Sequence, residues 1–128
     1  MVDIAARMEA IRDELEQFTK RPVTCDPRNV VPPCVLVEPP LVEPSGEALL
    51  CGDESLRLTY SVHVIGLPGA WAEFRPLSEL MAEMLVACDA ADFVWTQGAF
   101  GGYLPLNGPG GQQSEPSMAY TLTIEELV

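Results

Sequence analysis

The fold is decided by residues 56–65, which read Leu56-Arg57-Leu58-Thr59-Tyr60-Ser61-Val62-His63-Val64-Ile65. Large side chains of low polarity occupy every second position here, and the residues between them are Arg57, Thr59, Ser61 and His63. An alternation with a period of two places one set of side chains on each face of a β-strand. We therefore predict a strand over 56–65 that buries one face against a core.

Two amphipathic helices are predicted, one before this strand and one after it. The first has an apolar stripe with spacings of four and three, made by Ile4, Met8, Ile11, Leu15 and Phe18. Asp3 is its expected N-cap, and Pro22 is expected to end it. The second has the stripe Leu77, Leu80, Met81, Met84, Leu85 and Cys88. Pro76 fits the first turn of this helix, whereas it would kink a helix that began near Ala70.

Further strands are predicted at 34–38, 47–51, 93–97 and 117–124. The strand 34–38 is apolar on both faces, which is typical of a central strand. The strand 47–51 is expected to form a hairpin with 56–65, after a turn at 43–46, and 22–33 is expected to be an extended connector. The prediction is one α+β domain over residues 1–128, with a mostly antiparallel sheet of about four to five strands and two helices packed on one face.

The charge balance is strongly acidic, with 19 acidic against 7 basic residues and a net charge of −12. Such a surface repels nucleic acid and anionic membranes, and no apolar run approaches the ~20 residues that span a bilayer. The start of the chain lacks the basic and apolar regions of a signal peptide, so we expect a reducing cytosol. The four cysteines show no metal-binding spacing, and Cys34 and Cys88 are expected in the core.

Catalytic chemistry is sparse in this sequence. His63 is the only histidine, and a general-base role would require a nucleophile and a supporting acid beside it. We expect a hydrogen-bonded strand histidine instead, no enzymatic activity, and no metal or cofactor site. Trp71, Phe74 and Trp95 lack interleaved basic residues, so a core role is favoured over base stacking.

The segment 98–111 contains six of the ten glycines and is predicted to be a loop. It also carries large apolar and aromatic residues, for which a loop without its own core has little use. Our candidate protein-interface residues are therefore Phe100, Tyr103, Leu104 and Leu106. The alternative is that these side chains fold back onto their own domain.

The chain resembles the tail-terminator, or tail-completion, proteins of long-tailed bacteriophages. The resemblance rests on size, on the order of elements, and on three stretches: the opening helix 4–18, the strand 56–65 followed at once by the helix 77–88, and the closing strand within Ser117–Val128, which reads Ser-Met-Ala-Tyr-Thr-Leu-Thr-Ile-Glu-Glu-Leu-Val. It covers nearly the whole chain through patterns rather than signature motifs. Head-completion proteins of similar size share these patterns.

The resemblance implies a virion protein that assembles in the host cytoplasm as a homo-oligomeric ring, typically a hexamer, on the head-proximal end of the tail tube. Its implied partners are its own copies, the tail tube protein and the head–tail connector or stopper protein, while DNA passes through the ring without specific binding. No catalytic residue is implied. Two other hypotheses stand beside this one: a small acidic adaptor that binds a single protein partner, and an enzyme that uses His63.

Overall fold

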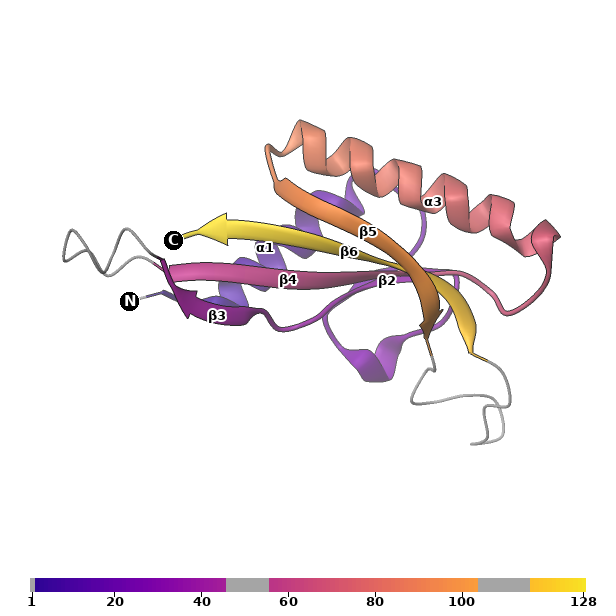
Figure 1. Ribbon diagram of the computed structural model, residues 1–128, viewed down its shortest axis with the longest axis horizontal. Helices are drawn as coiled ribbons and strands as arrows, with labels where there is room; N and C mark the ends of the chain where they lie inside the picture. The colour runs from indigo at the N-terminus through magenta and orange to yellow at the C-terminus, as the bar shows by residue number, and fades with distance from the viewer. Residues whose placement is uncertain (1, 46–55, 104–115) are drawn as a thin grey trace.

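The computed structural model describes residues 2–45, 56–103 and 116–128 of the chain (Figure 1). The helical elements in these residues are α1 (Ile4–Glu16), the short 3₁₀ helix η1 (Pro27–Asn29) and α3 (Trp71–Ala90). The strands are β1 (Val23–Thr24), β2 (Cys34–Val37), β3 (Leu41–Pro44), β4 (Leu56–Ile65), β5 (Val94–Tyr103) and β6 (Ser117–Leu127).

The six strands form one mixed sheet in the order β1-β2-β4-β6-β5, and β3 pairs with the part of β4 that β2 leaves free. Only β1 and β2 pair in parallel; every other pairing in the described chain is antiparallel. The predicted α+β class with a mostly antiparallel sheet is thus confirmed. The sheet has six strands rather than the predicted four to five, because β1 and β3 form in segments that we expected to be a connector and a proline-rich turn.

Both α-helices cover the same face of the sheet, which we call the helix face. The main core lies between the two helices and the sheet. It includes Met8, Ile11 and Leu15 of α1 together with Leu77, Leu80 and Met84 of α3. The sheet contributes the alternating residues of β4 that we predicted to point inward, such as Tyr60 and Val62, together with Leu122 and Ile124 of β6. Their burial confirms the period-two alternation as the feature that fixes the orientation of the sheet.

The opposite face of the sheet, which we call the open face, carries a second and smaller core at one end. The residues of this cluster are Val30, Cys34, Leu36, Ile65 and Ala119, with the partly buried Tyr103 packed against them. The chain between β1 and β2 therefore packs on the open face through Val30 and covers part of it. Because β2 is buried on both faces, all four of its residues are apolar.

The predicted turn at 43–46 is wrong in its first half. Residues 41–44 form β3, which pairs with β4 from Leu41 opposite Thr59 to Pro44 opposite Leu56. Proline lacks an N–H and is tolerated in a strand only where no partner needs that donor, as at a sheet edge. The predicted hairpin strand 47–51 lies outside the described residues.

The predicted loop at 98–111 is also wrong as far as it is described. Residues 98–103 continue the strand that we placed at 93–97, and β5 pairs with β6 as far as Tyr103 opposite Ser117. The single irregularity is a bulge between Trp95 and Gln97. Pairing with a long, regular β6 has outweighed the poor strand propensity of the glycines. Residues 104–111 lie outside the described chain.

The helix boundaries differ slightly from their predictions. Asp3 caps α1 by accepting a hydrogen bond from the Ala6 N–H at 3.0 Å, as expected, but the helix ends at Glu16, before Phe18. Helix α3 begins at Trp71 and runs through Pro76, so the proline lies beyond the first turn. Cys34 and Cys88 are buried as predicted, and burial raises the pKa of both thiols to about 11. Neither helix of the described chain is long and apolar enough to cross a membrane.

Candidate functional site

Strand β5 forms one edge of the sheet and has a free side along its whole length. Among the described residues it pairs with β6 on one side only. Nine of its ten residues are exposed. The sequence has no charged side chain between Asp92 and Glu115, so β5 is uncharged throughout, in a chain whose net charge is −12. A long, uncharged strand with unpaired backbone groups is the kind of edge that readily pairs with another chain.

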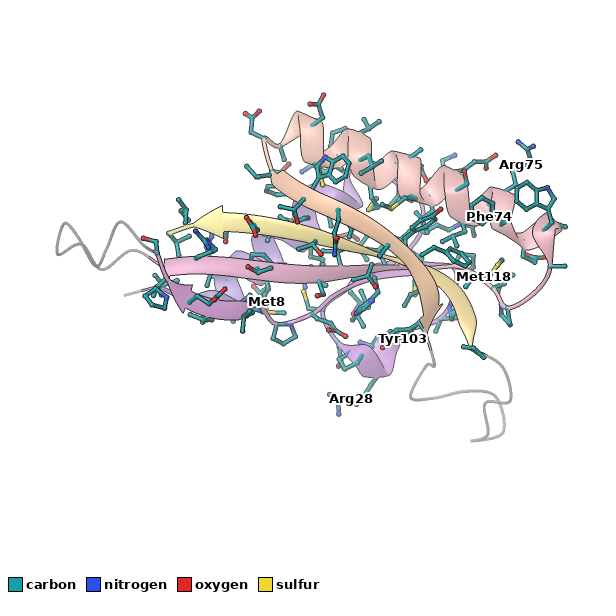
Figure 2. All side chains as sticks on the ribbon, in the orientation of Figure 1. Met8, Arg28, Phe74, Arg75, Tyr103 and Met118 are labelled. Carbon is teal, nitrogen blue, oxygen red and sulfur yellow. The ribbon has the colours of Figure 1, made fainter. Side chains whose placement is uncertain are left out.

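An aromatic cluster joins this edge to the start of α3. Trp71 stacks on Phe74 with ring centroids 5.2 Å apart, and Phe74 meets Phe100 of β5 edge-on at 5.9 Å. Phe100 in turn meets Tyr120, its partner across the β5–β6 pair, at 5.5 Å. These geometries are favourable for aromatic pairs. Figure 2 labels Phe74 in the first part of α3.

The cluster is open to solvent on its outer side. Trp71 is 79% exposed, Phe100 is 55% exposed, and Trp95, further back along β5, is 44% exposed. The predicted core role of the two tryptophans is therefore wrong: of the three residues, only Phe74 packs against the main core. We call the free side of β5, with the exposed side chains of Trp71, Val94, Trp95 and Phe100, the β5 edge surface.

The structure separates the predicted interface residues. Because directly opposed residues of an antiparallel pair share a face, Phe100 lies with Tyr120 on the helix face, and Tyr103 lies with Ser117 on the open face. Phe100 has features of both alternatives, an interface residue and a residue that folds back onto its own domain. It packs on its own domain and is still half exposed. Tyr103 is packed against the second core. Leu104 and Leu106 lie outside the described residues.

The glycines of β5 have distinct roles. A Cβ at position 98 would lie only 2.6 Å from Cε of Met81, so the end of the Met81 side chain occupies the space beside this glycine. A Cβ at position 101 would meet no atom within 4 Å. Gly101 therefore has no packing role in the described chain. Because Gly101 has no side chain, another backbone can approach the open face of the strand at this position.

His63 is held between an acid and a hydroxyl on the open face. Its Nε2 atom lies 2.9 Å from Oε1 of Glu38, and its Nδ1 atom lies 3.2 Å from Oγ1 of Thr121. The Tyr103 ring packs beside it with centroids 5.3 Å apart. The sequence did not reveal this arrangement, because Glu38 and Thr121 are distant in the chain and come together only through the β2–β4 and β4–β6 pairings.

Glu38, His63 and Thr121 follow the order acid, imidazole and hydroxyl of a catalytic triad. The backbone around the hydroxyl differs from that of a triad enzyme. Thr121 lies in the middle of β6, which pairs with a strand on each side. The backbone N–H groups near its hydroxyl therefore serve the two ladders rather than an oxyanion. The arrangement agrees with the predicted hydrogen-bonded histidine, and the absence of enzymatic activity stays a prediction.

A second polar network fastens α1 to the sheet. Arg7 donates hydrogen bonds to both carboxylate oxygens of Glu126, at 3.1 and 2.6 Å, and the Tyr60 hydroxyl donates to the same carboxylate at 2.6 Å. Burial opposes ionisation of Glu126, but the hydrogen bonds from Arg7 and Tyr60 outweigh it and lower the pKa of this carboxyl. The pKa of Tyr60 is raised, first by burial and then by the hydrogen bond to Glu126.

The network predicts a loss of stability in acid. A carboxyl whose pKa is lower in the folded state stabilises the fold above its unfolded-state pKa of ~4.3, and this contribution disappears as the pH falls through the folded-state value. Because Arg7 is about half exposed and screened by solvent, we expect Glu126→Gln to cost about 1 kcal/mol at pH 7. Urea unfolding at pH 7 and pH 3 measures the difference, which should shrink in acid. Glu125→Gln is the matched control, and an equal cost of Glu126→Gln at both pH values would contradict the linkage.

One hollow of about 450 Å³ lies between α3 and the chain that follows α1. Its lining includes two cations, Lys20 and Arg21, and two carboxylates, Glu79 and Glu83. The opposite charges compensate one another and do not select a ligand of either sign. No group of three or more residues able to hold a metal ion occurs in the described chain, which leaves the β5 edge surface as the candidate functional site.

Comparison of the chain with models of known protein families gives no match, and comparison with curated proteins gives no relative.

Proposed function

We propose that this chain is a structural protein of the virion of a long-tailed bacteriophage, a tail terminator that forms a ring on the head-proximal end of the tail tube. The observation that carries the proposal is the β5 edge surface. An exposed, uncharged edge with three solvent-facing aromatic side chains supports a protein that acts by contact. The resemblance in size, element order and three stretches of sequence supplies the particular function.

In this function the ring, typically of six copies, stops polymerisation of the tube and presents a surface to the head–tail connector or stopper protein. Contacts between copies are expected at α1 and at sheet edges other than β5, and a head-to-tail interface that closes into a ring leaves no free end. DNA passes through without specific binding, which suits a net charge of −12. The protein would be assembled in the host cytoplasm and reside in the tail.

The proposal is tested by native mass spectrometry over a concentration series, with negative-stain images of the largest species formed alone and with tail tubes. We expect closed rings, typically of six copies, in at least one of the two samples. In phage that lack the chain, we expect tails of uncontrolled length, because nothing stops growth of the tube. Tails of normal length in such phage would sink the proposal.

The same surface also supports a second function, a small acidic adaptor or head-completion protein that binds one partner. A single free edge is enough to receive one partner strand. This function predicts a monomer or dimer at every concentration and a one-to-one complex with its partner. The number of copies in the complex distinguishes the two functions.

A further inference from the structure

Strand β5 is the one unprotected edge among the described strands. Edges are usually protected by shortness, charge or proline. The other outer strands have such protection: β1 has two residues, and β3 has four, among them Glu43 and Pro44. Strand β5 has ten residues, with neither a charge nor a proline among them. Its unpaired backbone groups are therefore suited to receive an added strand.

The two faces of this edge differ, and the difference specifies the side chains of an added strand. On the helix face, Trp95 and Phe100 are exposed, and the start of α3 adds Trp71, which stacks on Phe74. On the open face, the strand carries Gln97, Ala99 and Gly101, opposite Thr123, Thr121 and Ala119 of β6. A strand that alternates apolar and polar residues would match both faces, with its apolar side chains beside α3.

The surrounding charge specifies the sign of the polar residues. Helix α3 carries Glu73 and Asp89 against the single base Arg75, besides Glu79 and Glu83, which share a hollow with Lys20 and Arg21. Glu125 lies opposite Val94 at the start of β5. The whole chain has a net charge of −12, so its field attracts a basic segment to this uncharged edge and repels an acidic one.

We propose that the β5 edge takes an extended segment of a different protein, which alternates apolar with basic residues and adds to the sheet as a strand. Backbone hydrogen bonds to β5 supply affinity, and the aromatic side chains on the helix face select the apolar positions. The inference rests on the proposed function in one respect: the segment would belong to the tube or connector protein that the ring contacts.

The test uses two peptides as probes, Ac-KVTVKVTVKV-NH₂ and Ac-EVTVEVTVEV-NH₂, titrated into the isotope-labelled chain and followed by NMR. We expect the lysine peptide to shift the amide signals of residues 94–103 and to slow hydrogen exchange of those N–H groups that point away from β6. We expect the glutamate peptide to bind about tenfold more weakly. Added salt should reduce the gap between the two peptides.

Two substitutions at one open position provide the matched pair. Because a Cβ at position 101 meets no atom within 4 Å, Gly101→Lys and Gly101→Glu both leave the fold intact, which circular dichroism checks. Gly101→Lys should weaken the lysine peptide several-fold by like-charge repulsion, and Gly101→Glu should not weaken it. Ala82→Glu, on the exposed surface of α3, controls for the change in net charge and should leave the β5 signals as they are.

Three results would overturn the inference: no response of the β5 amides to the lysine peptide, equal binding of both peptides, or β5 shifts that depend on protein concentration alone, which would identify a second copy as the occupant. The outcome is separable from that of the proposed function. Rings on tail tubes with no peptide binding would reject this inference alone. Peptide binding, together with normal tails in phage that lack the chain, would reject the tail-terminator function alone.

Discussion

Replacing Leu122 by alanine is expected to lower the free energy of unfolding by about 3–4 kcal/mol. Leu122 is fully buried in the middle of β6, opposite Val62 of β4 on one side and Gly98 of β5 on the other. Gly98 has no side chain to refill the space, although Met81 of α3, whose methyl group lies beside Gly98, is flexible and can fill part of it. The cavity should therefore collapse only in part, and the cost should lie well above that of simple transfer from water.

Leu127→Ala is the matched control, because it makes the same substitution in the same strand at a position that is 62% exposed. It should change the free energy of unfolding by less than about 0.5 kcal/mol. Urea unfolding at pH 7, followed by circular dichroism, measures both variants. A similar small loss for the two would mean that the core between β6 and α3 is not packed as described.

The predictable parts of the fold are the segments in which apolar side chains repeat with the period of a strand or a helix. The alternation in 56–65 and the helical stripe at 77–88 each indicate one buried face, and each face is buried as predicted. Asp3 could likewise be assigned as a cap from its side chain alone. In these segments local preference and tertiary packing agree.

The wrong predictions concern segments that form a strand only because they pair with a neighbouring strand. Strand β5 has glycines at positions 98, 101 and 102, and β3 ends on a proline, so neither has the composition of a strand. Each forms because a regular partner, β6 or β4, offers a row of backbone groups that must be paired. Such pairing links distant segments, and local sequence contains no signal for it.

The candidate site could be predicted only in part, for the same reason. Phe100 was identified because an aromatic residue among glycines is unusual, and it does lie on the β5 edge surface. Trp71 and Trp95 were assigned to the core because large aromatic residues are mostly buried. Their exposure depends on β5 being the last strand of the sheet and on α3 beginning beside it, which is a property of the topology.

The second core on the open face yields the other large effect. Ile65→Ala should lower the free energy of unfolding by about 2–4 kcal/mol, because Ile65 is fully buried between Cys34 of β2 and Ala119 of β6. Its neighbours in this cluster are few, and three of them, Val30, Cys34 and Ala119, are small. The space left by the missing atoms therefore has little material to fill it.

Val31→Ala is the control for this variant, since Val31 lies in the same covering segment and is 70% exposed. It should be nearly neutral. If Ile65→Ala cost less than about 1 kcal/mol, the chain between β1 and β2 would not be packed on the open face. The expected large cost would instead make that segment a structural element, which fixes Tyr103 at the end of β5 and with it the direction in which the β5 edge leaves the sheet. The free edge that we propose as the contact surface would then be held in position by cores on both faces of the sheet.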